Sequence, residues 1–363
     1  MTTGPVLELQ DAAMDWAALV TRQPVDLSPF ATRGWLSAWT AAFAGTERPA
    51  AVLAGEPAEP TGGLVAATAR RPVLPALRVQ VMLGCESADY APAVALDAAA
   101  AGALAERWLG GTAAPALLLV GRLRPDGLLL PALQRVAAGS GWTLTPMLTE
   151  EFPVVTLDPD GAGDSLDEAG LRRLAKRNDV LRRRRKLAER GQVEVLPAQD
   201  PAGRPGLADF FALHDRRWRT KSGTPSGLFV APRGRAMVRE LAREWWADGL
   251  LRLSFVTVDG TPLAGRFGVR LGETYYGLKS AFDPEYATYG PGHMMTHAVL
   301  ADALATGARR MEFMRGAGDH KRAWGGQGRP VSFWVASRGV PARAVPHLAR
   351  YVLWSRHRRR EGR

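Results

Sequence analysis

The chain has 363 residues, of which 46% are hydrophobic and 23% charged, a balance typical of globular rather than disordered proteins. Its formal net charge is +11, and its one cysteine excludes both an internal disulfide and a zinc cage made of cysteines. The start of the sequence lacks the pattern of a signal peptide, and the longest apolar run, residues 113–120, is too short to span a bilayer. We therefore expect a cytoplasmic protein.

This length favours two domains. We expect an N-terminal half over residues 1–150, a C-terminal domain over residues 151–340, and a basic C-terminal helix or tail over residues 341–363. In the first half, Trp35, Trp39 and Phe43 follow helical spacing. The patterns predict helices at residues 29–43, 97–109 and 128–138, and strands at residues 50–54, 64–69, 77–83 and 116–120.

The second half opens with a predicted strand, residues 153–157, and one long basic helix over residues 166–190. The segment from Leu171 to Arg190 contains ten Lys or Arg and two acidic residues, so its formal net charge is +8. The expected inward face of the helix carries Leu171, Leu174, Asn178, Leu181 and Ala188. Its arginines, Arg182 and Arg183 among them, suit the binding of a phosphate-bearing substrate, a nucleic acid or a membrane surface, and a solvated helix is the plain alternative.

An antiparallel meander follows. Asp259-Gly260 is a strong hairpin signal between two apolar segments. We predict strands at residues 193–196, 250–258, 262–271, 274–282, 310–314 and 331–337, and helices at residues 207–219, 235–248 and 293–306. Strands that lead into a helix and then into another strand indicate an α/β fold with a mixed sheet.

The segment with the clearest chemistry is residues 287–292, ATYGPG, between a predicted strand and a predicted helix. Glycines let the backbone approach a ligand closely, and the free amides at a helix N-terminus attract phosphate. We expect Tyr289, Gly290, Gly292 and His293 to bind a diphosphate, although a plain turn has the same composition.

In order along the chain, residues 174–191, 218–221, 259–264, 275–292, 307 and 315–324 resemble the GNAT-type acetyltransferase domain of CelD-type and FemAB-like proteins. Residues 29–43 and 85–90 resemble the companion half of that family. The resemblance implies two tandem GNAT-like (acyl-CoA N-acyltransferase) domains, the first one degenerate, with mixed, largely antiparallel sheets and flanking helices. It also implies acyl transfer from acyl-CoA, such as acetyl-CoA, to an amine or hydroxyl of a small molecule or sugar.

The same resemblance suggests catalytic residues. A Lys is typical of the position of Lys321, where it would stabilise an oxyanion, and His320 beside it would take the proton of the acceptor. Asp283 would orient the acceptor or act as a base, or else cap a turn. Ala287 stands where the family's loop has Gln or Arg, which leaves more of the phosphate contact to backbone amides.

For the acceptor, the resemblance points to Asp89 and Tyr90 in the first half and to Trp218 and Lys221 in the second. No metal is expected, because His293 and His297 lack the Glu of an H-E-x-x-H site. An aminoacyltransferase that uses charged tRNA and a non-enzymatic nucleic-acid-binding or scaffold protein remain open alternatives. Peripheral membrane contact and the oligomeric state remain open as well.

Overall fold

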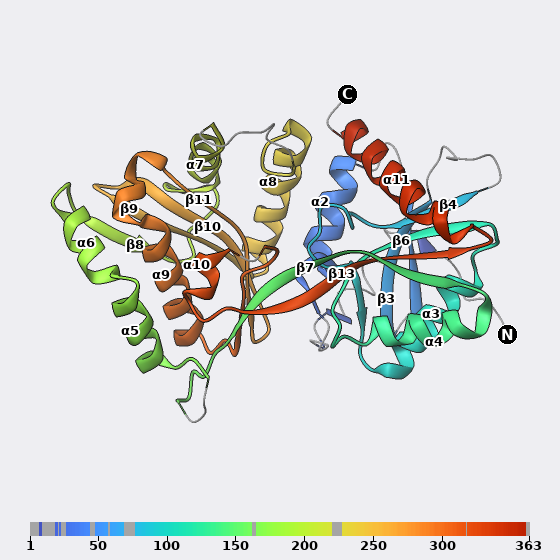
Figure 1. The fold of residues 1–363 in the computed structure, drawn as a ribbon. Coiled ribbons are helices and arrows are strands. Elements are labelled where there is room, and N and C mark those ends of the chain that lie inside the picture. The colour runs from blue at the N-terminus through green and yellow to red at the C-terminus, as the bar shows by residue number, and fades with distance from the viewer. Residues whose placement is uncertain are drawn as a thin grey trace. The chain divides into compact units, whose positions relative to one another are not determined.

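The fold was analysed in a computed structural model. It describes residues 7–8, 19–20, 22, 27–43, 48–56, 59–68, 77–161, 165–219, 227–316 and 318–360. The chain divides into two compact units, Met1–Glu150 together with Pro330–Arg363, and Glu151–Arg329. It passes from the first unit to the second within β7 (Thr143–Thr156) and returns within β13 (Gln327–Arg338) (Figure 1). Residues 330–340, expected in the second domain, thus belong to the first unit.

The first unit is a sheet in the order β1-β2-β3-β4-β6-β13, with β5 paired to β3. Its other strands are β1 (Leu7–Glu8), β2 (Arg48–Glu56), β3 (Glu59–Thr68), β4 (Arg78–Met82), β5 (Ala93–Ala95) and β6 (Ala116–Leu123). Its helices are η1 (Pro29–Ala31), α2 (Arg33–Phe43), α3 (Ala98–Gly110), α4 (Leu129–Ser140), η4 (Ala342–Ala344) and α11 (Val345–Arg360). Only β4 and β6 pair in parallel among these recorded pairings.

Local chemistry explains the helix limits in this unit. Asp97 accepts a hydrogen bond from the amide of Ala100 at 2.7 Å and so caps α3. Gly141 ends α4 in the left-handed region, at φ 70°. The core lies between β6, which is buried along its whole length, and helices α3 and α4, and it also takes Val345 and Ala349 from α11.

The second unit is a sheet in the order β7-β12-β11-β10-β9-β8. Its strands besides β7 are β8 (Val193–Leu196), β9 (Leu251–Val258), β10 (Thr261–Leu271), β11 (Thr274–Phe282) and β12 (Arg310–Glu312). Its helices are α5 (Glu168–Arg177), α6 (Val180–Ala188), α7 (Leu207–Arg219), α8 (Pro232–Ala247), η3 (Pro284–Tyr289), α9 (Pro291–Ala305) and α10 (Asp319–Arg322). Helices α5, α6 and α9 cover one face of the sheet, and α7 and α8 pack on the other (Figure 1).

The predicted hairpin joins β9 and β10. Asp259 and Gly260 both have positive φ values, 46° and 74°, which match the twist that two-residue hairpins require. The two strands pair antiparallel from Thr261 opposite Val258 onward, as the sequence predicts.

The prediction of one long basic helix over residues 166–190 is wrong. The segment breaks into α5 and α6 at Asp179, whose φ of 57° is left-handed. Asn and Asp tolerate that conformation better than other side chains with a Cβ. The break also turns the register of α6, so that Val180 and Leu187 are buried while Leu181 is 68% exposed.

Strand β12 is short and leaves one edge of β11 unpaired. It ends at Glu312 instead of the predicted residue 314. It pairs in parallel with residues 274–276 of β11, whereas β11 continues along β10 to Phe282. Met314 adopts a left-handed φ of 58°, a conformation that terminates a strand. Residues 277–282 of β11 therefore extend beyond the end of β12, and the site described next lies there.

Candidate functional site

A cavity of about 260 Å³ lies in the second unit beside the free part of β11. Residues far apart in the sequence form its wall. They are Arg217, Arg266, Ser280, Ala281, Phe282, Ala287, Gly290, Pro291, Gly292, His293, Met295, Thr296, His320 and Trp324. Helix α7, strands β10 and β11, the start of α9 and helix α10 thus meet at one hollow.

The glycine loop forms one side of this cavity, as the sequence predicts. Gly290 is both the C-cap of η3 and the N-cap of α9, and its φ of 61° is left-handed. A Cβ placed on Gly292 would meet only Phe282 Cδ1, at 4.0 Å, so open space lies in front of this residue. The amide of His293 donates to Gly290 O at 2.9 Å. That amide closes the turn, so the first-turn amide left for a ligand is that of Gly292.

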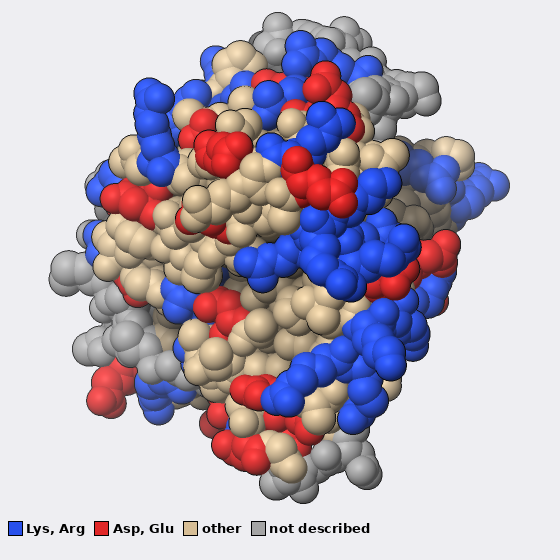
Figure 2. Space-filling model, turned by 90° about the vertical axis from the view of Figure 1, so that its left-hand side faces the viewer, with Lys and Arg blue, Asp and Glu red and all other residues tan. Residues whose placement is uncertain are grey.

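Helix α6 brings positive charge to the loop. A Cβ on Gly290 would lie 2.6 Å from Arg183 Nη1, so the guanidinium rests against this glycine. Arg190 Nε donates to the Tyr289 hydroxyl at 3.1 Å, and Lys186 Nζ lies 5.8 Å from the centre of the Tyr289 ring. Arg182 instead pairs with Asp179 at 2.8 Å on the exposed side of the helix. The side of the molecule that carries α5 and α6 shows dense groups of Lys and Arg (Figure 2).

The surroundings of both imidazoles in the cavity wall lower their pKa values and so favour the neutral form. The indole Nε1 of Trp324 donates to His293 Nδ1 at 3.2 Å, which leaves the ring proton of His293 on Nε2. Burial and the charge of Arg183 lower the pKa of His293. Burial, together with the charges of Lys321, Arg266 and Arg217, lowers the pKa of His320 to about 4. A neutral imidazole of this kind can accept a proton at neutral pH.

Lys321 lies behind the wall rather than in it. Its side chain is only 9% exposed, and Nζ donates to the carbonyls of Met314 at 2.9 Å and Arg315 at 2.7 Å. These bonds hold the left-handed turn that ends β12, and so they fix the loop that carries His320. The position of Lys321 is that of a structural clamp next to the cavity.

Asp283 is also occupied by its own surroundings. Its carboxylate caps η3 by accepting from the amide of Glu285 at 3.1 Å, and it pairs with Arg216 Nε at 3.1 Å. The structure therefore gathers Gly290, Gly292, His293 and His320 around one hollow, while Asp283 and Lys321 support its edges. The catalytic roles expected for Asp283 and Lys321 stay predictions.

The residues expected at the acceptor are dispersed. Trp218 sits on α7, where its indole donates to His214 Nε2 at 2.7 Å, and Lys221 lies outside the described residues. Asp89 is buried in the first unit. Tyr90 lines a small cavity of about 30 Å³ in that unit, with the Arg124 guanidinium 4.9 Å from its ring centre.

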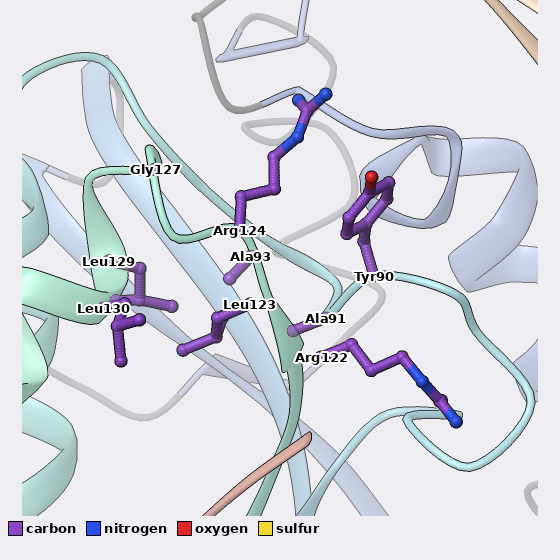
Figure 3. A pocket seen from close by; sticks show the side chains of 9 residues that line it. All are labelled: Tyr90, Ala91, Ala93, Arg122, Leu123, Arg124, Gly127, Leu129 and Leu130. Carbon is purple, nitrogen blue, oxygen red and sulfur yellow. The ribbon is translucent and has the colours of Figure 1, made fainter. Parts of the chain in front are cut away.

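Figure 3 shows Tyr90 and Arg124 on one side of this small cavity and three leucines on the other, with Arg122 turned away. Arg122 is engaged elsewhere, because Nε pairs with Glu150 at 2.8 Å and Nη1 donates to Ala88 O at 3.2 Å. A volume of this size holds roughly one or two water molecules. The acceptor role of Asp89 and Tyr90 is not addressed by this arrangement and stays a prediction.

Sequence reasoning missed two arginines in the cavity wall, Arg217 and Arg266. Arg266 lies within the apolar strand segment LAGRFGV and is 5% exposed. A lone charge inside a buried strand is costly unless it has a role, and this was the signal available in the sequence. Arg217 offered no such signal, because it stands among other arginines near the end of an amphipathic helix.

Residues 175–322 match the family model described as the acetyltransferase (GNAT) domain. The match covers less than half of the chain and lies in the second unit, where the expected GNAT fold is confirmed. No curated protein matches the sequence.

Several solved structures share the fold. FemX aligns with a TM-score of 0.62 at 13% identity, over 94% of this chain and 98% of its own. The C-terminal DUF2156 domain of a putative lysylphosphatidylglycerol synthetase from Agrobacterium fabrum gives 0.54 at 10% identity, over 95% and 96%. The structure of L-PGS from Bacillus licheniformis gives 0.52 at 12% identity, over 90% and 96%. At these identities the likeness establishes a GNAT, FemAB-like fold and leaves the substrate open.

Two further observations concern cofactors and membranes. In the part of the chain that the structure describes, no group of three or more His, Cys, Asp or Glu could hold a metal ion. None of the described helices is long and apolar enough to cross a bilayer.

Proposed function

We propose that this protein transfers an acyl group from an acyl-CoA, such as acetyl-CoA, to an amine or hydroxyl of a small molecule or sugar. One observation carries the proposal. The glycine loop of residues 290–292 opens into the cavity where β11 extends beyond β12, and α6 places cations on the loop. This combination suits a long, phosphate-bearing donor whose reactive end enters the hollow. Since acyl-CoA and tRNA are made in the cytoplasm, we also propose that location.

The donor diphosphate would lie at Gly290 and Gly292. Ala287 lines the cavity but has no side chain able to bind phosphate. Arg183 reaches Gly290 from α6 and would supply the missing positive charge, with Tyr289 held next to it by Arg190. An arginine can bind phosphate with two parallel hydrogen bonds. Arg183 from α6 can therefore make the phosphate contact that Ala287 of the loop cannot make.

The reaction would proceed by direct attack. The acceptor nitrogen or oxygen forms a bond to the acyl carbon, the carbon–sulfur bond breaks, and the electron pair leaves with the thiolate. His320, neutral at physiological pH, accepts the acceptor's proton, which can then reach the thiolate. We assign Lys321 to holding the loop of His320, through its bonds to Met314 and Arg315, and Asp283 to shaping η3.

Calorimetric titration with acetyl-CoA tests the donor site. Gly292→Val should weaken binding at least tenfold, because a Cβ at this position enters the open space in front of the loop that the donor would occupy. Arg183→Gln should weaken binding by roughly 5- to 50-fold, as for a lost charged hydrogen bond. Arg182→Gln is the matched control, since this neighbour pairs with Asp179 on the exposed side. Equal affinity in all four proteins would show that the loop is only a turn.

A second candidate is a FemAB-like aminoacyltransferase that takes charged tRNA. The observation in its favour is that most basic residues of α5 and α6 are exposed, and that this side of the molecule shows dense groups of Lys and Arg (Figure 2), which is more charge than one diphosphate needs. A parallel titration with charged and uncharged tRNA separates the two. Non-specific polyanion binding falls steeply with salt and ignores the aminoacyl group, whereas a site for an aminoacyl-tRNA donor would favour the charged form. Asp89, Tyr90, Trp218 and Lys221 remain our candidates for the acceptor in either case.

The non-enzymatic alternative, a nucleic-acid-binding or scaffold protein, makes a different prediction. In that case neither acetyl-CoA nor charged tRNA would be consumed on incubation with any acceptor. Occupation of the cavity by a donor, measured in the titration above, would argue against it.

A further inference from the structure

Within the described part of the chain, Arg266 is a buried guanidinium without a counter-ion. The residue is 5% exposed and lines the cavity from β10. Its Nε is fully buried and has no hydrogen-bond acceptor, and among the described residues the guanidinium makes no ion pair and no recorded hydrogen bond. An isolated buried charge costs several kcal/mol unless a partner offsets it. An anionic ligand in the cavity would supply such a partner.

The protein is built to hold the guanidinium in place. A Cβ placed on Gly277 would lie 2.5 Å from Arg266 Nη1, so the glycine of β11 makes room for it. On another side, the guanidinium carbon lies 5.7 Å from the centre of the Phe313 ring. Gly277 and Phe313 thus form a cradle that fixes the guanidinium in the cavity wall.

A second arginine shares the same wall. Arg217 reaches in from α7, donates to Ser280 O at 3.2 Å, and lies 4.5 Å over the ring of Phe282. Burial lowers the pKa of Arg217, and burial together with the charge of Arg217 lowers the pKa of Arg266. The residues that line the cavity include these two arginines and two histidines but no Asp or Glu. Among the described residues, the charged groups of this wall are therefore the two guanidinium groups, and no carboxylate lies beside them.

We propose that Arg266, with Arg217 beside it, forms a subsite that binds an oxyanion of the substrate, a carboxylate or a phosphate. This deepens the proposed function, because the subsite occupies the same cavity as the donor loop. It predicts that one reactant carries an anionic group close to its reacting atoms. That reactant is either an acceptor with a carboxylate or phosphate near its amine or hydroxyl, or a donor with an acidic acyl chain. The planar fork of an arginine fits both oxyanions with two hydrogen bonds.

The test uses the thermal stability of the full chain in inorganic phosphate and in acetate, each against chloride at equal ionic strength. At several times its Kd, either anion should raise the Tm of the wild type by roughly 2–4 °C. Arg266→Met, which replaces the charge by an apolar chain beside Met311 and Phe313, should lose this gain. Arg270→Met is the matched control, because Arg270 lies on the same strand outside the cavity.

The stability of the variants without anion provides an independent readout. Removal of an uncompensated buried charge should leave Arg266→Met at least as stable as the wild type, whereas a merely structural arginine would lower the Tm on removal. A gain from acetate that persists in full in Arg266→Met overturns the subsite, and so does a wild type that responds to neither anion, whereas part of the phosphate gain can come from the donor loop. Arg183→Gln separates this result from the donor site. If that variant alone loses the phosphate gain, phosphate binds the donor loop and the subsite proposal fails while the proposed function stands.

The source of the oxyanion follows from two donors titrated in calorimetry. If the acyl chain supplies it, succinyl-CoA should bind the wild type at least tenfold more tightly than acetyl-CoA, and the two should bind Arg266→Met equally. If the acceptor supplies it, both donors should bind alike to both proteins, while the anion gain in Tm depends on Arg266. Tighter binding of succinyl-CoA in wild type and variant alike would contradict the assignment to Arg266.

Discussion

Among single residues, His320 is the one whose surroundings most define its chemistry. It stands on the short helix α10, and the next residue of that helix, Lys321, bonds the turn that ends β12. Three positive neighbours and partial burial work in the same direction and keep its imidazole neutral. Lys321 and His320 are adjacent in the sequence, yet the first stabilises the turn and the second is the proposed proton acceptor.

The pH dependence of turnover follows from this environment. Since a pKa lowered to about 4 keeps the imidazole unprotonated above that value, kcat should rise as pH increases through about 4 and then stay flat with respect to this group. His320→Gln should reduce kcat by roughly 10²- to 10⁴-fold, as for loss of a general base, and leave donor affinity unchanged. Initial rates from pH 4 to 8 measure both effects.

His297→Gln is the control for that measurement. His297 contacts the ring of Trp324 from α9 but does not line the cavity, so its variant should keep the rate of the wild type. A profile in which activity appears only above an apparent pKa near 6.5 would contradict a base held neutral by its neighbours.

At the scale of elements, the corner between α5 and α6 links the basic helices to the cavity. Asn178 Nδ2 and Arg177 Nη2 both donate to Ala323 O, at 3.1 Å and 2.6 Å, next to the Trp324 that orients His293. The left-handed turn at Asp179 makes this docking possible, and it allows α6 to present Arg183 to Gly290.

Substitutions at Asp179 test the corner. Glycine pays no steric penalty at a φ of 57°, so Asp179→Gly should leave the free energy of unfolding unchanged or raise it by up to about 1 kcal/mol. Asp179→Val should lower it by roughly 1–2 kcal/mol, because β-branched side chains resist this conformation. The exposed pair with Arg182 is lost in both variants and contributes little. Urea unfolding decides, and equal stability of the two variants would exclude strain at this position.

The elements also show what the sequence can reveal. Strands β8 and β11 and helix α7 begin and end where periodicity predicts, because each has its own local signals. The break at Asp179 has no comparable signal, since Ala323, to which the neighbouring Asn178 donates a hydrogen bond, lies far away in the chain. The early end of β12 depends in the same way on Lys321 and the turn at Met314.

One part of the site is predictable from local sequence, whereas the other part depends on tertiary packing. Gly290, Gly292 and His293 are recognisable because glycines before a helix have a meaning of their own. That they share a hollow with Arg266 and His320 depends on how β10 and α10 pack around β11. Lys321 and Asp283 were selected for their chemistry, yet the fold uses their polar atoms for hydrogen bonds within the protein.

For the whole molecule, the net charge of +11 should govern contacts with polyanions. We expect non-specific binding of duplex DNA and tRNA that weakens by more than tenfold between about 50 and 200 mM salt. Binding of acetyl-CoA should weaken much less over that range, because the glycine loop and the partly buried Arg183 are screened less than exposed arginines.

A variant with Arg172, Arg173, Arg184 and Arg185 changed to Gln isolates the exposed charge, since all four are exposed. It should lose most of the DNA affinity in a gel-shift assay and keep its affinity for acetyl-CoA. A parallel loss of both affinities would mean that the donor and the polyanion occupy one surface.

The uneven lengths of β11 and β12 have one more consequence. Beyond Tyr276, β11 keeps its pairing with β10, but its other edge no longer pairs with β12, and residues 280–282 line the hollow. The Arg217 guanidinium donates to one of their carbonyls, Ser280 O. A flexible arm that contains amides, lying extended in this gap, could complete the ladder much as an added peptide strand completes an open sheet edge. Such an arm would be recognised by its backbone-like pattern of donors and acceptors, whatever group it carries at its tip.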